Sequence, residues 1–415
     1  MSFLTTIAAE RSRLDGAIAI MAVAAMIGVM FAGSTLLTPL YIIYKQRFGF
    51  SDITLTLIYA AYVVGNLGAL LVFGRLSDQI GRRYVALPAL AVALLSTIIF
   101  LLANRTAELF WARALSGLGI GVAAGTGNAW LAELIGRDKA WATIISTCTN
   151  FVGLALGALV AGLLAQYAPW PLHLSFVVYI AAVVLVTALI WHTRETVAQP
   201  VHNISAVSLR PSLSVPRELR AQFVAPAVAG FGAMALVGFF AALAPSILAQ
   251  ELHETSHAAA GWTVFELAMI CAATIVLTSR LSSRVAMLCG LGLMVPSVAL
   301  LVAAQLLASM ALMIGATAVC GASAGLGYRG SLQVVNQIVP EDRRAEVVSG
   351  YFVCCFIGNA LPIIGVGIIS AHAGMPMASG IFAGMIALFA VGALAFSIRH
   401  PGRSETRGDA ASRYR

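Results

Sequence analysis

Three ionisable side chains fall inside long apolar stretches of this sequence: Arg113, Glu266 and Arg329. A charged group in hydrocarbon is costly, so such residues usually face a cavity, pair with one another or take part in transport. Glu266 lies about 14 Å into the apolar stretch that begins at His257, because a helix rises 1.5 Å per residue. A carboxyl group at that depth could gain and lose a proton or contact a substrate. The structural alternative is a fixed pair with a buried arginine or a hydrogen bond to a neighbouring helix.

The two arginines lie in glycine-rich surroundings. Arg113 begins the pattern Arg-x-x-x-Gly-x-Gly-x-Gly, in which Gly117, Gly119 and Gly121 permit close helix packing. We expect Arg113 to tune a proton site or to hold an anionic group; alternatively, its long side chain could extend to the membrane surface. For Arg329 three roles remain open, namely binding an anionic substrate, pairing with a buried acid such as Glu266, or reaching the membrane interface.

Uncharged polar and aromatic residues within the apolar stretches are candidates for the wall of a cavity. Asparagine side chains in such positions either contact a substrate or bridge helices, and aromatic rings either suit an aromatic or amphipathic substrate or fill a core. The main candidates are Asn66, Asn128, Asn150, Asn359 and Tyr62, and the further aromatic ones are Phe31, Tyr41, Tyr59, Phe239 and Phe240.

The segment from His253 to His257 matches the zinc-binding pattern His-Glu-x-x-His. It lies at the junction of two apolar stretches without a catalytic domain around it, so we interpret it as a solvated polar loop. A membrane-embedded zinc enzyme is the remote alternative. The sequence has no phosphate-binding Gly-x-x-x-x-Gly-Lys-Ser/Thr loop, and direct drive by ATP is therefore not expected. We expect no metal site, no cofactor and no enzymatic activity.

The composition determines which elements carry these residues. Of the 415 residues, 60% are hydrophobic and only 10% are charged, and the mean hydropathy is +0.92. These values exclude a water-soluble globular fold. A helix needs about 20 apolar residues to cross a hydrocarbon layer of ~30 Å, so the chain has enough for roughly twelve crossings. We predict an all-α membrane protein with 12 transmembrane helices.

The apolar stretches fall into two groups of six, separated by a polar segment that contains several prolines and arginines. We predict an N-terminal six-helix bundle over 1–192, a cytoplasmic linker over 193–221, a C-terminal six-helix bundle over 222–398 and a cytoplasmic tail over 399–415. The helices are expected at 17–43, 52–74, 84–103, 107–135, 140–166, 172–192, 222–250, 257–279, 285–305, 309–338, 345–371 and 376–398.

The two groups are related by a repeat with an offset of 205 residues. Arg75-Leu76-Ser77 matches Arg280-Leu281-Ser282, and the small residues of 153–162 match those of 358–367. One offset kept at several places indicates duplication. We therefore predict two pseudo-symmetric bundles with a substrate cavity between them near the middle of the membrane, exposed to each side in turn.

The basic residues are distributed unequally between the two sides of the predicted membrane. With both termini inside, the outward loops hold only Lys45, Arg47 and Arg105, while the other loop and tail arginines lie inside. The positive-inside rule then predicts cytoplasmic termini, in an inner (cytoplasmic) membrane of the bacterial type. The net charge of +8 reports this topology and does not indicate binding to nucleic acid.

The loop from Gly74 to Tyr84 reads GRLSDQIGRRY. It resembles the signature loop of the major facilitator superfamily, Gly-x-Leu-(Ser/Thr/Ala)-Asp-(Arg/Lys)-x-Gly-(Arg/Lys)-(Arg/Lys), with Gln79 where a basic residue is common. The resemblance implies that this loop latches the two halves in the outward-facing state. The aspartate would face the start of the eleventh helix, and an arginine would meet an acid at the inner end of the fourth. The latch residues implied are Gly74, Asp78, Gly81, Arg82, Arg83 and Glu133. The alternative is that the two arginines only enforce topology.

The same resemblance implies a secondary active transporter of the twelve-helix type. The Arg113 pattern is similar to one prominent in proton-coupled members, whereas Ala158 stands where the family's antiporters have a proline. We expect proton-coupled efflux of small organic molecules by alternating access; the alternative is a proton-coupled uptake symporter for a metabolite such as an organic anion. The expected partners are a small-molecule substrate, protons and the lipid bilayer, with the chain working as a monomer.

Overall fold

The fold was obtained as a computed structural model, which describes residues 14–74, 76–136, 138–197, 215–340 and 343–399. Within these ranges the chain is almost wholly helical, without a strand and with one isolated β-bridge between Leu14 and Thr193. Twelve of the described helices are long and apolar enough to cross a membrane. The predicted twelve-span, all-α fold is confirmed, and the protein is a multi-pass membrane protein.

Eleven of the spans agree with the expected ones to within a few residues, whereas the first, expected as one helix over 17–43, is divided into α2, η1 and α3. The first half comprises α2 (Gly16–Thr35), η1 (Thr38–Leu40), α3 (Tyr41–Phe48), α4 (Asp52–Phe73), α5 (Leu76–Ile80), α6 (Arg82–Leu102), α7 (Thr106–Ile135), α8 (Lys139–Tyr167) and α9 (Leu174–His192). The second half comprises η3 (Arg217–Leu219), α10 (Arg220–Gln250), α11 (His257–Leu277), α12 (Ser283–Leu306), α13 (Met310–Ile338), α14 (Arg344–Ala373) and α15 (Met375–Arg399).

Short polar residues determine where several of these helices begin. The hydroxyl groups of Ser51, Ser256, Ser282 and Ser309 each accept a hydrogen bond from a backbone N–H in the first turn of α4, α11, α12 and α13. Such N-caps satisfy backbone donors that have no partner within the helix. These four apolar runs therefore start at a serine that the sequence marks locally.

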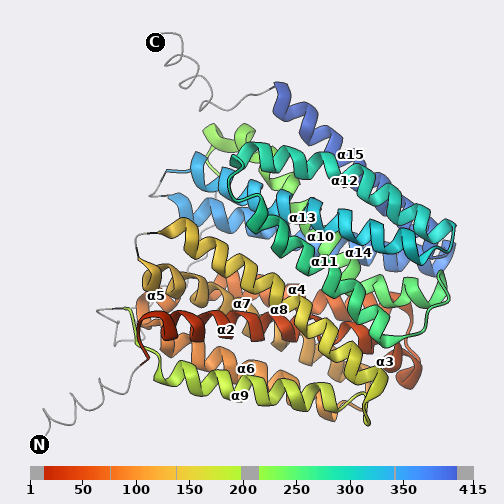
Figure 1. Cartoon of the computed structure of the whole chain (residues 1–415), viewed down its shortest axis with the longest axis horizontal. Helices are drawn as coiled ribbons and strands as arrows, with labels where there is room; N and C mark the ends of the chain where they lie inside the picture. The colour runs from red at the N-terminus through yellow and green to blue at the C-terminus, as the bar shows by residue number, and fades with distance from the viewer. Residues whose placement is uncertain (1–13, 75, 137, 198–214, 341–342, 400–415) are drawn as a thin grey trace, which may run out of the picture.

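The helices form two bundles that lie side by side (Figure 1). In the first bundle α2 packs against α7 and α8, and α4 and α6 pack against α7. In the second, α10 packs against α13 and α14, and α12 packs against α13 and α15. Two helix pairs, α8 with α11 and α4 with α14, form the seam between the bundles.

The two ends of the molecule differ chemically. One end, called the basic end below, holds the loop between α4 and α6 and the ends of α7, α11 and α13, with Arg82, Arg280 and Arg343. The opposite end, called the far end, holds the connections at 49–51, 103–105, 168–173, 251–256 and 307–309. The two ends lie on opposite sides of the predicted membrane.

Two glycines at the repeat offset make equivalent contacts in the two bundles. A Cβ atom on Gly153 of α8 would lie 2.2 Å from the carbonyl oxygen of Gly28 in α2. A Cβ atom on Gly358 of α14 would lie 2.4 Å from the carbonyl oxygen of Phe231 in α10. In both bundles the fifth helix thus approaches the first more closely than any side chain would permit.

We predict that Gly153→Ala destabilises the protein. The added methyl group must displace the backbone of α2, and overpacking of this kind costs about 1–3 kcal/mol. Thermal unfolding of purified protein in detergent measures the effect. Gly365→Ala in α14 is the matched control, because a Cβ atom there meets nothing within 4 Å. Equal melting temperatures for the two variants would contradict the prediction.

Candidate functional site

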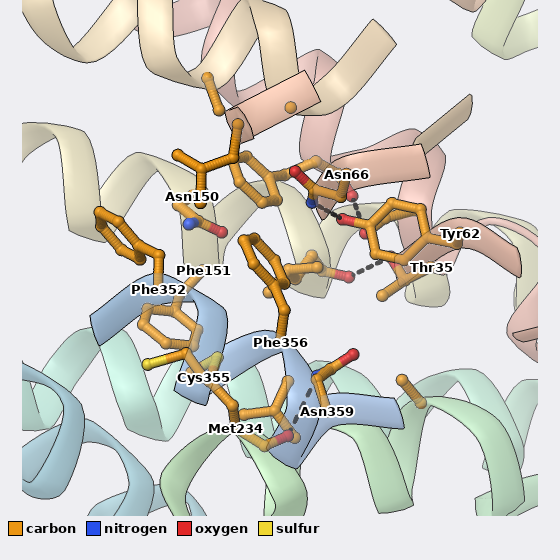
Figure 2. A pocket seen from close by; sticks show the side chains of 18 of the residues that line it. Thr35, Tyr62, Asn66, Asn150, Phe151, Met234, Phe352, Cys355, Phe356 and Asn359 are labelled. Carbon is orange, nitrogen blue, oxygen red and sulfur yellow. Dashed lines mark hydrogen bonds between the residues drawn. The ribbon is translucent and has the colours of Figure 1, made fainter. Parts of the chain in front are cut away.

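A cavity of about 170 Å³ lies at the seam between the two bundles. Its wall comes from both halves, and none of the described lining residues carries a carboxylate or a basic group. Figure 2 shows Phe352, Cys355 and Phe356 of α14 on one side, with Asn66 and Tyr62 of α4 on the other. A concave, mostly apolar lining with a few polar groups is typical of a site for a small organic molecule.

All five residues expected in a cavity wall lie in this one. Asn66 Nδ2 donates to the hydroxyl of Tyr62 at 3.2 Å, and Asn359 Nδ2 donates to the carbonyl of Met234 at 3.0 Å. Asn128 accepts a hydrogen bond from Ser146, whereas Asn150 Oδ1 has no partner among the described residues. Of the further aromatic candidates, Phe31 and Tyr59 line the cavity. Phe239 and Phe240 lie in the core of the second half, where Phe239 stacks on Phe382.

Hydrogen bonds between the bundles close the cavity toward the far end. The Tyr59 hydroxyl donates to Asn359 Oδ1 at 2.8 Å, and the Thr38 hydroxyl donates to the carbonyl of Ala241 at 2.7 Å. Nearer the loops, the backbone N–H of His257 donates to Gln166 Oε1 at 2.9 Å. These contacts join α4, η1 and α8 of the first bundle to α14, α10 and α11 of the second.

The cavity opens toward the basic end. Its lining residues Tyr59 and Asn66 of α4 are buried. By contrast, Gly125 and Asn128, which lie in the half of α7 nearer the basic end, are exposed. Because exposure increases in that direction, a solute could enter the cavity from the basic end while the far end is closed.

Arg113 lies behind the tyrosine wall of the cavity. It is 0% exposed, so its side chain does not extend to the membrane surface, which was one of the alternatives. The guanidinium carbon is 5.0 Å from the ring centre of Tyr62 and 5.6 Å from that of Tyr59. Both rings line the cavity. Arg113 is therefore separated from the cavity by a single layer of aromatic side chains, through which cation–π attraction acts.

The structure does not place Arg329 against Glu266. The Arg329 guanidinium donates to the carbonyls of Thr278, Ser279 and Leu281, with distances of 2.9 Å to Ser279 and 3.0 Å to Leu281. These carbonyls follow the end of α11, where a helix has backbone acceptors without internal partners. Arg329 thus caps the C-terminal end of α11, and the suggested pair with Glu266 is wrong.

Glu266 lies outside the cavity wall. It is partly buried on the face of α11 that also carries Trp262 and Ala273, four residues before and seven after it, and both of those residues are exposed. Residues at these spacings share one side of a helix. The carboxyl group therefore lies on the side of α11 that points away from the protein core, at the depth expected from the sequence. The neighbouring residues Val264, Leu267 and Ala268 are buried in the core.

Arg82 connects three helices at the basic end. Its guanidinium pairs with Asp78 of α5 and with Glu133 of α7, where Nε lies 3.2 Å from Glu133 Oε2, and it also donates to Ser77 Oγ at 2.7 Å. Gly81, which precedes it, has a φ of 110° that a residue with a Cβ atom rarely adopts. The other glycine of the loop, Gly74, ends α4. These contacts lie within the first bundle; a latch contact between Asp78 and the start of α14 stays a prediction.

Glu195 is a member of this cluster that sequence reasoning misses. Its carboxylate accepts hydrogen bonds from the backbone N–H groups of Arg82 and Arg83, both at 2.9 Å, and so caps α6. A carboxylate at a helix N-terminus is stabilised by the helix dipole. The Arg83 guanidinium donates to the carbonyl of Trp191 at 3.2 Å, and Thr196 donates to Glu133. The start of the linker is thereby bound to the loop. Glu195 and Arg82 are more than a hundred residues apart in the sequence, so no local pattern reveals this contact.

The His-Glu-x-x-His segment does not have the geometry of a zinc site. His257 is the first residue of α11, and His253 lies outside the helix with a φ of 54°. The two histidines therefore do not lie one turn apart on a helix, as that motif requires. Glu254 accepts the backbone N–H of Ser256 at 2.9 Å. In the part of the chain that the structure describes, no three His, Cys, Asp or Glu side chains gather as metal ligands would.

Two pseudo-symmetric helical bundles with an uncharged cavity at their seam define a membrane transporter. The sequence profile of the Major Facilitator Superfamily matches residues 22–234 and 226–413. The chain belongs to this superfamily, as the loop at 74–83 indicates.

Solved structures of other transporters have the same fold. The human organic anion transporter MFSD10 superposes with a TM-score of 0.69 at 16% identity, covering 90% of this chain and 98% of that one. A bacterial homologue of the human lysosomal transporter Spinster, in an inward-facing and occupied conformation, superposes with a TM-score of 0.67 at 16% identity, covering 91% and 94%. At these identities the likeness shows the fold alone.

The similar proteins of known name include drug-resistance proteins and an antibiotic export protein. Chloramphenicol resistance protein CraA of Acinetobacter baumannii is 26% identical over 233 residues, which is 55% of this chain and 54% of CraA. Cephamycin export protein CmcT of Amycolatopsis lactamdurans is 34% identical over 128 residues, 30% of this chain and 26% of CmcT. Putative multidrug resistance protein MdtD of Escherichia coli is 29% identical over 136 residues, 32% and 28% of the two chains. The matches span about a quarter to a half of these relatives.

Proposed function

We propose that this transporter exports small, largely apolar organic molecules from the cytoplasm in exchange for protons. The observation that carries the proposal is the cavity, which has aromatic and amide walls and no carboxylate or basic group among its described lining residues. A neutral or amphipathic compound can enter such a site without leaving a charge unpaired. The names of CraA and MdtD support small drug-like organic molecules as substrates, and the name of CmcT supports export.

The orientation belongs to this proposal. If the basic end faces the cytoplasm, as the positive-inside rule predicts, the cavity described above is open to the cytoplasm and closed to the outside. An exporter loads its substrate in that arrangement. We further propose that the transporter works as a monomer in an inner membrane of the bacterial type, and that the loop around Arg82 stabilises the opposite, outward-facing state.

Transport by everted membrane vesicles tests the direction. We expect vesicles that contain the protein to accumulate radiolabelled chloramphenicol or lipophilic dyes when respiration acidifies their interior, and a protonophore to abolish the accumulation. Vesicles from cells without the protein are the control. Lack of accumulation across a broad panel, with uptake by right-side-out vesicles instead, would favour the symporter alternative and sink the export proposal.

Glu266 is the candidate for proton coupling. Its carboxyl group lies near the middle of the span, on the side of α11 that points away from the protein core. An ionised group is strongly disfavoured there. We predict that Glu266→Gln abolishes proton-driven accumulation in the everted vesicles but leaves exchange of labelled for unlabelled substrate intact. Glu251→Gln, at the far-end loop after α10, is the matched control and is expected to transport normally. Full driven accumulation by Glu266→Gln would show that this carboxyl group has no coupling role.

A further inference from the structure

Arg113 is a buried cation whose hydrogen-bond donors are unused. Its Nε, Nη1 and Nη2 atoms are buried and have no partner among the described residues. The buried hydroxyl of Tyr41 lies next to the guanidinium and interacts with it, but it has no well-formed hydrogen bond to a described residue. Buried polar groups in proteins nearly always have partners, because an unmet buried donor costs about 1–3 kcal/mol. Several such donors at one place point to a ligand.

The described acids of the first bundle are engaged elsewhere, so none can serve as the counter-charge. Asp52 pairs with Lys45, Asp15 pairs with Arg194, and Asp78 and Glu133 pair with Arg82. The three others accept backbone N–H groups at the ends of helices. The tyrosine rings over Arg113 reduce the cost of burying its charge, but they leave its N–H groups free.

The chemistry of the free groups selects the ligand. A guanidinium group offers only donors, arranged to bind a carboxylate or a similar anion, and it cannot act as an acceptor. We propose that Arg113 and Tyr41 form a binding site for one monovalent anionic group, behind the Tyr59 and Tyr62 side of the cavity. The group is either a free small anion such as a halide or the carboxylate of a cargo molecule that reaches between the two rings. The cargo form rests on the proposed export function, and the free-anion form does not.

The site is connected to the contact between the bundles. Tyr59 covers Arg113 with its ring and donates its hydroxyl to Asn359 of the second bundle. An anion that draws Arg113 away from the ring, or a carboxylate that displaces the ring, would change the position of Tyr59. It would thereby alter the hydrogen bond between Tyr59 and Asn359. Occupancy of the site is thus expected to favour one arrangement of the two halves.

Thermal unfolding of the purified protein in chloride-free detergent solution tests the site. Sodium gluconate, whose anion is far bulkier than a halide, sets the reference at constant ionic strength. Sodium chloride and bromide probe the free-anion form. Sodium benzoate probes the cargo form and is compared with benzamide, which has the same shape without the charge. A ligand that binds the folded state raises the melting temperature in a saturable, concentration-dependent way.

We expect saturable stabilisation by the halides, by benzoate or by both, and none by benzamide. Arg113→Gln should abolish the response, and Tyr41→Phe should weaken the apparent affinity about tenfold, as expected for one hydrogen bond to a charged group. Arg194→Gln, an exposed arginine near the start of the linker, is the matched control for the change in net charge and should respond like the wild type. If Arg113→Gln does not fold, Tyr41→Phe alone decides, because it removes a single hydroxyl.

The outcomes separate this inference from the proposed function. A response to halides assigns the site to a free anion, and a response to benzoate alone assigns it to a carboxylate of the cargo. A flat response to all salts, or an equal response in Arg113→Gln, overturns the site even if everted vesicles accumulate drugs. An Arg113-dependent response in a protein that fails the vesicle assay retains the site and rejects the export function.

Discussion

Replacing Arg329 by glutamine is expected to lower the free energy of unfolding by about 2–4 kcal/mol. The substitution removes charge-assisted hydrogen bonds to the carbonyls of Thr278, Ser279 and Leu281 and leaves the end of α11 without its partner. Each bond to a charged group contributes about 1.5–3 kcal/mol. The total is less than their sum because Ser279 and Leu281 are exposed, and water can replace the arginine there.

Thermal or denaturant unfolding in detergent measures this loss. The matched control is Arg280→Gln, which removes the same charge from an exposed position in the same loop and should change stability by less than about 0.5 kcal/mol. Substrate affinity should stay within a few-fold of the wild type in Arg329→Gln protein that is still folded. A stable variant that has lost substrate binding would instead support the anion-binding role considered for Arg329.

The second large effect is expected from Tyr59→Phe. This variant keeps the ring over Arg113 but removes the hydroxyl that joins the two bundles, and Asn359 Oδ1 loses its donor. Both residues are buried, so the loss should cost about 1–2 kcal/mol. Since the hydrogen bond exists only while the far end is closed, the population open at the far end should rise about 5- to 30-fold.

Spin labels at the far end can report this population. Tyr167 and Leu307 are exposed there, on the first and the second bundle, and the distance between labels at these positions should lengthen in Tyr59→Phe. Tyr62→Phe is the matched control: it also removes a cavity hydroxyl, but one that bonds to Asn66 within the same helix. Identical distance distributions in the two variants would show that the Tyr59–Asn359 bond does not hold the halves together.

Much of the fold and part of the site could be predicted from local sequence. Hydropathy is a sum over about twenty consecutive residues, so the twelve spans follow from the chain alone, and serine caps mark several of their starts. Asn66 and Asn359 could be selected because an amide side chain inside an apolar span usually contacts a substrate or a neighbouring helix. The cluster around Arg82 could be found only in part: the loop pattern identifies Arg82, but no pattern joins it to Glu195 of the linker.

What the sequence determined by itself is the depth of each residue in the membrane, together with the family and its twofold repeat. What only the tertiary structure decided is the direction in which each side chain points. Glu266 lies near the middle of its span, yet it is on a side of α11 away from the cavity wall, and Arg329 bonds to the end of that helix. The physical reason is that lipid and protein core are equally apolar, so hydropathy places a span along the membrane normal but does not define its rotation about its own axis. Packing of the neighbouring helices decides that rotation, and with it which buried charges have partners.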